Sequence, residues 1–168
     1  MATTRRRKAT PKTKQWSGYH RILWPTDFSP LAKTALPHAV GLATQTAAEL
    51  VLLHVLPSLA AYVTPELSGA LSVSLQRKTR AAAQRELRRL EAQVKAPKIR
   101  IHTVLTEGVA FQQIVRAAKR LRCDLIVMAT HGRTGLVHAI MGSVAENVLR
   151  QAPCPVLTVR PFRFLRGV

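Results

Sequence analysis

Acidic residues are scarce in this sequence. Only 8 of the 168 residues are Asp or Glu, against 26 Lys and Arg, so the formal net charge is +18 at pH 7. The first twenty residues contribute six of these bases and no acid, and the rest of the chain stays basic without them. A surface of this sign attracts polyanions without specificity, although solubility alone also accounts for such a charge.

Cysteine is almost absent as well. Cys123 and Cys154 form neither a C-x-x-C pair nor a metal-ligand spacing, so no zinc site is expected. We predict two free thiols that are at least partly buried, and a cytoplasmic location for the protein. No Ser/His/Asp set indicates a hydrolase, and no catalytic residue is assigned.

Long apolar runs are missing too. No run approaches the roughly 18 residues that a membrane-spanning helix needs, and no secretory core lies near the N-terminus. We therefore expect no membrane partner. Aromatic residues make up only 5% of a chain that is 47% apolar, which favours a globular domain with tight aliphatic layers. The length indicates a single domain.

Residues 1–17 form a basic segment with no periodic apolar pattern, which predicts a mobile arm. An organelle transit segment is the alternative, but the amphipathic apolar face of such segments is missing. We expect the folded domain to begin directly after this arm.

Short apolar runs then alternate with helical patterns. Strands are expected at 21–24, 49–57, 98–105, 124–130 and 155–160, and helices at 30–43, 72–94, 109–121 and 143–149. This alternation predicts a parallel sheet with helices on both faces, and the alternating third strand indicates an exposed edge. Ser29 and Pro30 are typical of a helix start, whereas Pro37 should kink or shorten that helix.

Three loops share the carboxyl edge of the expected sheet: "PTD" ends the first strand, "HVLP" the second and "ATHG" the fourth. Ligands of open parallel sheets bind at this edge. Asp27 of the first loop can accept hydrogen bonds from ribose hydroxyls or an adenine amino group. Its alternative role is to stabilise a helix dipole. His54 and His131 lie at the same edge, where a lone histidine is more often structural than a ligand.

The fourth loop has features of a phosphate site. Gly142 and Ser143 start a helix, whose N-terminal amides and dipole favour an anion. The Ser143 hydroxyl either caps that helix or reaches the anion. Gly132 either adopts a positive φ or lets a ligand approach closely. The loop matches neither the P-loop nor the G-x-G-x-x-G motif. Arg133 can supply a charge to it, although an ordinary surface arginine is the more common alternative.

The segments "PTDFS", "LLHV" and "DLIVMATHGRTGLVHAIMGSVAENVLRQAPCPVLTVR" closely resemble the universal stress protein family, over about Tyr19 to Arg160. The resemblance implies a three-layer α/β sandwich of Rossmann-like, adenine-nucleotide-binding type. Its five-stranded parallel sheet would have the order 3-2-1-4-5. We therefore assign residues 18–161 to this domain, flanked by the arm 1–17 and a short basic tail at 162–168.

Nucleotide-binding members of that family carry G-x2-G-x9-G-[ST], which here reads Ala129, Gly132, Gly142, Ser143. The first glycine is replaced, and the methyl group of Ala129 would crowd the ligand, or be strained if φ is positive. By position, Pro25, Thr26 and Asp27 would line the adenine and ribose side. Val55 would offer backbone hydrogen bonds to adenine.

The resemblance also implies how the rest of ATP is held. Ribose and phosphates would be wrapped by the segment 129–135, with these residues: Ala129, His131, Gly132, Arg133, Thr134 and Gly135. The distal phosphates would lie at Gly142, Ser143 and Val144, bridged by Mg or Mn. The family's last strand pairs antiparallel across a two-fold axis, which implies a homodimer through 155–160.

Three hypotheses follow. The first is a cytoplasmic ATP-binding protein of stress response or signalling, with at most slow hydrolysis, because no general base with a clear proton path is visible. The second, motivated by Ala129, is an interaction module of the same fold that binds no nucleotide. The third is weak, non-specific nucleic-acid binding by the arm and these basic residues: Arg77, Lys78, Arg80, Arg85, Arg88 and Arg89.

Overall fold

A five-stranded parallel sheet forms the centre of the protein, as predicted, with the strand order β3-β2-β1-β4-β5. The computed structural model describes residues 17–58, 70–94, 99–132 and 141–160. Its elements are β1 Arg21–Thr26, α1 Pro30–Lys33, α2 Leu36–Thr46, β2 Glu49–Leu56, α3 Ala70–Gln93, β3 Ile101–Glu107, α4 Ala110–Arg120, β4 Leu125–Ala129, α5 Ser143–Gln151 and β5 Val156–Val159.

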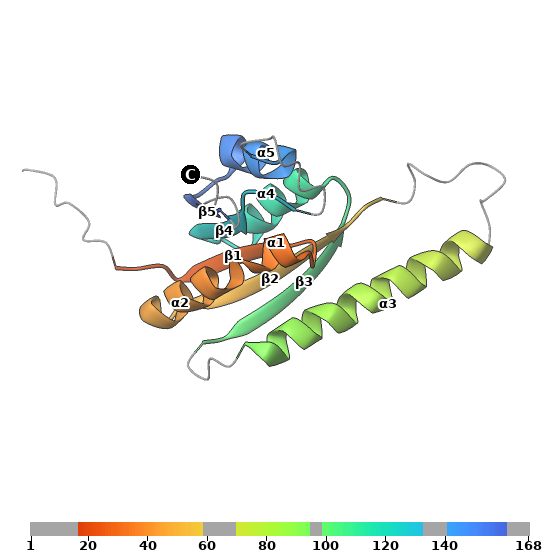
Figure 1. Ribbon diagram of the computed structural model, residues 1–168, viewed down its shortest axis with the longest axis horizontal. Coiled ribbons are helices and arrows are strands. Elements are labelled where there is room, and N and C mark those ends of the chain that lie inside the picture. The colour runs from red at the N-terminus through yellow and green to blue at the C-terminus, as the bar shows by residue number, and fades with distance from the viewer. Residues whose placement is uncertain (1–16, 59–69, 95–98, 133–140, 161–168) are drawn as a thin grey trace, which may run out of the picture.

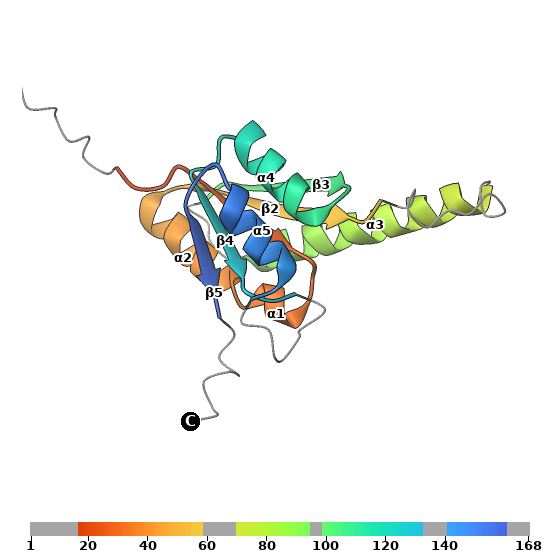
Figure 2. The same cartoon turned by 90° about the horizontal axis from the view of Figure 1, so that it is seen from above.

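The helices cover the sheet from both sides (Figures 1 and 2). Because successive strand residues face opposite ways, Trp24 packs in one core with α2 and α3, while Leu23 packs in a second core with α4 and α5. Both side chains are fully buried. Within the described ranges, no helix has the length and apolar character needed to cross a membrane. The tail at 162–168 and all of the arm except Ser17 lie outside these ranges.

The first strand is longer than predicted. We expected "PTD" to end it, but β1 continues through Pro25 and Thr26, which pair in register with Leu53 and His54 of β2. On the other side, β4 pairs with β1 only at Ile22 and Leu23, so Pro25 lies beyond that ladder. The carboxyl ends of β1 and β4 are therefore not joined, and a crevice can form between them.

The predicted helix at 30–43 is two helices, α1 and α2. The Ser29 cap is confirmed, since its Oγ accepts a hydrogen bond of 3.0 Å from the Ala32 amide. Of the two effects expected of Pro37, the kink is absent, because this residue lies in the first turn of α2. An N–H would have no helical partner there, so proline is tolerated. The shortening is confirmed, since α1 ends at Lys33.

The third strand is also shifted from its expected position. It was expected at 98–105 with "TEG" as its turn, but β3 runs from Ile101 to Glu107, which pairs with Leu56. The prediction that it forms an edge of the sheet is confirmed.

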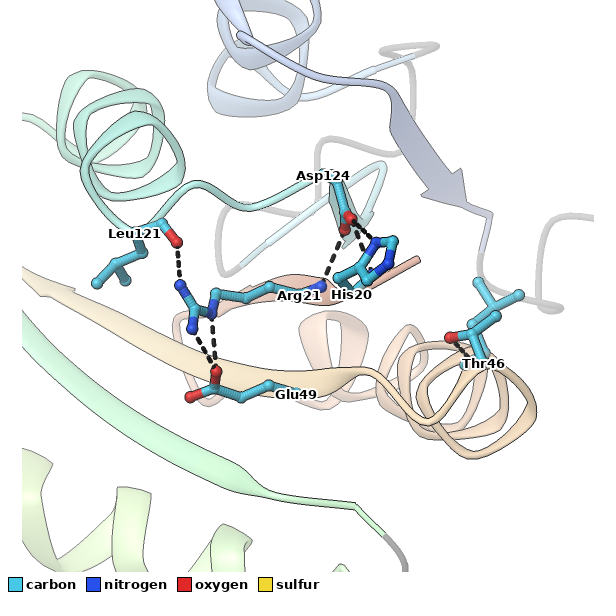
Figure 3. A network of polar contacts seen from close by, with 7 residues as sticks. His20, Arg21, Thr46, Glu49, Leu121 and Asp124 are labelled. Atoms are coloured by element: carbon cyan, nitrogen blue, oxygen red, sulfur yellow. Dashed lines mark hydrogen bonds and ion pairs between the residues drawn. The ribbon is translucent and has the colours of Figure 1, made fainter. Parts of the chain in front are cut away.

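Polar contacts join the elements at the amino edge of the sheet (Figure 3). The Asp124 carboxylate accepts hydrogen bonds from the backbone amides of His20 and Arg21, at 2.8 and 3.0 Å. The Arg21 guanidinium forms an ion pair of 2.7 Å with Glu49 and donates to the Leu121 carbonyl. These contacts tie the start of β1 to β2 and to the loop between α4 and β4.

Both cysteines are free, Cys123 buried and Cys154 half-buried. Burial, with a smaller contribution from Cys154, raises the pKa of the Cys123 thiol from 9.0 to about 12. Burial also raises the pKa of Cys154. Because both pKa values are raised, both thiols stay protonated at neutral pH. Only the thiolate is nucleophilic, so both thiols react slowly.

We expect folded Cys154→Ser protein to be alkylated by iodoacetamide at Cys123 on the order of a thousandfold more slowly than the same protein in denaturant, at about pH 8. Mass spectrometry of timed samples measures both rates. Equal rates in the two states would contradict the assigned burial of Cys123.

Candidate nucleotide site

A cavity of about 260 Å³ opens at the carboxyl edge of the sheet, where β1, β2 and β4 end. This volume lies just below the roughly 300–1,000 Å³ of typical ligand pockets. Ten of the thirteen residues that the resemblance assigns to the ligand line it: Pro25, Thr26, Asp27, Val55, Ala129, His131, Gly132, Gly142, Ser143 and Val144. The other three, Arg133, Thr134 and Gly135, lie outside the described residues. The three predicted loops do meet at one place.

The sequence analysis missed most of the apolar wall of this cavity. The further lining residues are Ala32, Leu53, Ala110, Ile114, Met128, Thr130 and Ala145. All except Thr130 are apolar, so in the sequence they are indistinguishable from core. The one available signal was position, because Leu53 and Met128 precede the carboxyl ends of their strands.

Asp27 and Gly132 are in direct contact across the cavity. The Asp27 Oδ1 accepts a hydrogen bond of 2.9 Å from the Ser29 amide, which fixes the carboxylate. A Cβ atom on Gly132 would lie 2.6 Å from the Asp27 Oδ2, closer than any real contact. The φ of Gly132 is not positive. Glycine is therefore needed here for the approach of this carboxylate.

Gly142 closes the loop onto the end of β4. Its amide donates a hydrogen bond of 2.8 Å to the Thr130 carbonyl, and a Cβ on Gly142 would lie 3.2 Å from that oxygen. Gly142 is the N-cap of α5 and provides no side-chain cap, so Ser143 begins the helix and does not cap it. The amides of Ser143, Val144 and Ala145 in the first turn are left for a ligand.

Ala129 ends β4 without a positive φ, so the backbone strain that a positive φ would cause is absent. Its side chain is buried in the core on the α2 face, and it also borders the cavity.

The two histidines have different surroundings. His54 Nδ1 donates to the Thr26 carbonyl at 2.7 Å, and the ring stacks on Phe28 with 4.1 Å between centroids. This contact fixes the end of β1, which is a structural role. His131 is buried at the cavity with its Nδ1 2.9 Å from the Thr130 Oγ1.

In the described part of the chain, no three His, Cys, Asp or Glu side chains are grouped to hold a metal.

Several known proteins are similar to this chain in sequence and structure. A universal stress protein of Methanocaldococcus jannaschii is 34% identical over 84% of this chain and 82% of its own length. The universal stress protein A homolog 1 of Coxiella burnetii is 33% identical, over 84% and 96%. The structure of UspA from Lactobacillus plantarum superposes with a TM-score of 0.71 at 32% identity, covering 85% and 99%.

Another similar structure, at 20% identity, contains a bound nucleotide. A universal stress family protein from Arabidopsis thaliana, solved with AMP bound, superposes with a TM-score of 0.60 over 84% of this chain and 91% of its own. At that identity the likeness establishes the fold alone. The model of the universal stress protein family matches residues 18–160. On these grounds, the chain belongs to the universal stress protein family.

Proposed function

We propose that this protein binds an adenine nucleotide, ATP in particular, in the cavity at the carboxyl edge. The observation that carries the proposal is the placement of a fixed carboxylate and an uncapped helix start around one apolar cavity. Asp27 can accept hydrogen bonds from ribose hydroxyls. The first-turn amides of α5 suit the phosphates, because they carry partial positive charge. The apolar wall of Leu53, Ile114 and Met128 suits the base.

Ligands of related proteins support the choice of adenine. The Arabidopsis protein was solved with AMP, and a further universal stress protein, of 22% identity, in complex with cAMP. ATP contains the same nucleoside, and its additional phosphates would lie toward α5. Mg or Mn would be carried by those phosphates, and Gly142, Ser143 and Val144 would lie beside them. We propose a role in stress response or signalling in the cytoplasm, with the nucleotide held and hydrolysed slowly or not at all.

Mass spectrometry of small molecules released on denaturing freshly purified protein is the first test. ATP, ADP or AMP in near-stoichiometric yield supports the proposal. Calorimetric titration of nucleotide-free protein with ATP and magnesium is the second. No saturation at millimolar ATP would reject it, and would favour the alternative of a nucleotide-free interaction module.

The variant Ala129→Gly distinguishes these alternatives. Because Ala129 has no strained backbone, we expect its ATP affinity to change less than about threefold, while removal of a buried methyl lowers the free energy of unfolding by about 1 kcal/mol. Titration calorimetry and urea unfolding measure the two quantities. A large gain in affinity would instead mean that the methyl group blocks the native site.

We also propose a homodimer through β5. This strand is an edge of the sheet, and its Leu157 is 38% exposed, which is a liability if the edge is unpaired. We expect the wild type to sediment as a dimer and Leu157→Lys as a monomer with the same circular dichroism. A monomeric wild type at micromolar concentration would reject the dimer.

Nucleic-acid binding by the basic arm is a second candidate function, favoured by the net charge of +18. Binding through phosphates should weaken steeply with salt. Deletion of residues 1–17 tests the part played by the arm. Unchanged DNA and RNA affinity after this deletion would exclude it.

A further inference from the structure

Among the described residues of the folded domain, the net charge is confined to one half of the sheet. Residues 70–94 and 99–122, which include α3, β3 and α4, carry eleven Lys and Arg against three Glu. The other described ranges, 17–58, 123–132 and 141–160, carry four bases and four acids and are neutral. Solubility alone requires no such separation, so the basic half calls for another explanation.

Within the basic half, a groove of about 380 Å³ lies between β3 and α4. Its lining is Thr106, Gln113, Arg116, Ala117, Lys119 and Arg120. The three bases are exposed on α4, and no ion pair or hydrogen bond to them occurs among the described residues. We define this set of six residues as the α4 groove.

No carboxylate faces the α4 groove from β3. Glu107 is the one acid of that strand, and its carboxylate contacts the Gln76 amide of α3, on the opposite face, at 3.4 Å. Thr106 faces α4 instead, where its hydroxyl donates to the Gln113 Oε1 at 3.1 Å. Arg116, Lys119 and Arg120 are thus next to neutral hydrogen-bonding groups, an arrangement that leaves their charge available to an anion.

The basic surface continues on the other side of β3. Helix α3 lies along this strand and extends past the end of the sheet, as both views show (Figures 1 and 2). Its six Lys and Arg are exposed. Among the described residues, Arg89 is the one base of these six that forms an ion pair, with Glu86 at 3.8 Å. Edge strand β3 is therefore flanked by bases on both faces. A ligand that contacts both must be long and carry repeated negative charge.

Nucleic acid fits this surface better than an acidic protein does. Protein interfaces are organised around buried apolar or aromatic anchors, and Ala117 is the only apolar residue of the α4 groove. Phosphate backbones require only cations and neutral donors. No aromatic residue lines the groove, so there is no stacking platform of the kind that single-strand binders use.

We propose that the α4 groove, together with α3, binds the phosphate backbone of duplex nucleic acid without base specificity. The sequence hypothesis placed such binding on the arm and α3, and the structure adds α4 as the helix with unopposed bases. This site is separate from the nucleotide cavity and does not depend on its function.

The test compares two triple variants of the full chain that lose the same charge. Arg116→Gln/Lys119→Gln/Arg120→Gln removes the bases of the groove, whereas Lys33→Gln/Arg150→Gln/Arg160→Gln removes exposed bases of the neutral half. Fluorescence anisotropy measures binding of a labelled duplex of about 20 base pairs over a range of salt concentrations. Circular dichroism verifies that both variants fold.

We expect the groove variant to raise the Kd at least about tenfold at low salt, and to reduce the slope of log K against log salt by about 2 to 3. The control variant should leave the slope unchanged. Equal weakening by both variants would overturn the proposal, since net charge alone would explain it. It would also be overturned if polyglutamate bound the wild type with the same groove dependence while the duplex did not bind.

Discussion

Gly132→Ala is expected to weaken ATP binding about thirtyfold, the largest effect that we predict for a change of one methyl group. The added Cβ would lie 2.6 Å from the Asp27 Oδ2, so the carboxylate must turn away from the cavity. Loss of a charge-assisted hydrogen bond to ribose costs about 2 kcal/mol, which corresponds to that factor. Calorimetric titration with ATP measures the effect.

Gly41→Ala is the matched control. Gly41 lies within α2, and a Cβ there would meet nothing within 4 Å. This change should leave ATP affinity unaltered and raise stability by up to about 1 kcal/mol, because alanine is the better helix former. If Gly132→Ala bound ATP as tightly as the wild type, Asp27 would not be a ribose ligand. The melting temperature distinguishes the expected loss of affinity from a fold defect, which would also weaken ATP binding.

Asp124→Ala is expected to lower the free energy of unfolding by about 2 kcal/mol without affecting ATP binding. The change leaves the amides of His20 and Arg21 without their acceptor at the start of β1. The effect is moderate because the Asp124 side chain is 37% exposed, so water replaces part of what is lost. Urea unfolding measures the change.

Two further variants make the Asp124 result specific. Asp124→Asn keeps one oxygen acceptor and should retain part of the stability. Glu146→Ala breaks an exposed pair with Arg150 and should cost no more than about 0.5 kcal/mol. Equal losses for Asp124→Ala and Glu146→Ala would show that the amino-edge network contributes nothing beyond an ordinary surface pair.

The alternation of apolar runs and helical patterns was sufficient to predict the parallel α/β class, because apolar residues are spaced differently in buried strands and in helices. The boundaries of elements were harder to predict where a tertiary contact overrides the local preference of the residues. "PTD" has the composition of a strand end, yet β2 pairs with Pro25 and Thr26 and extends β1 through them. One continuous helix was expected over 30–43 because the sequence does not show that the chain begins a new helix at Leu36.

The candidate site was predicted in its loops but not in its wall or its internal contacts. Asp27 and Gly132 were each identified, but their contact joins residues far apart in the chain, and no periodicity reports it. The pairing of Gly142 with Thr130 removes one of the amides that the sequence offered to a phosphate. The α4 groove was missed because three bases in one helix are common in any sequence. Only the structure shows that Glu107, the acid of the neighbouring strand, faces α3 and not these bases.

Helix α4 borders both of the sites discussed above. Ala110 and Ile114 line the proposed nucleotide cavity, while Arg116, Lys119 and Arg120 of the same helix line the α4 groove. A rigid shift of α4 would change both at once. By thermodynamic linkage, if filling the cavity alters affinity at the groove, occupation of the groove alters nucleotide affinity by the same factor. The eleven residues of α4 thus form one continuous helix that borders both cavities.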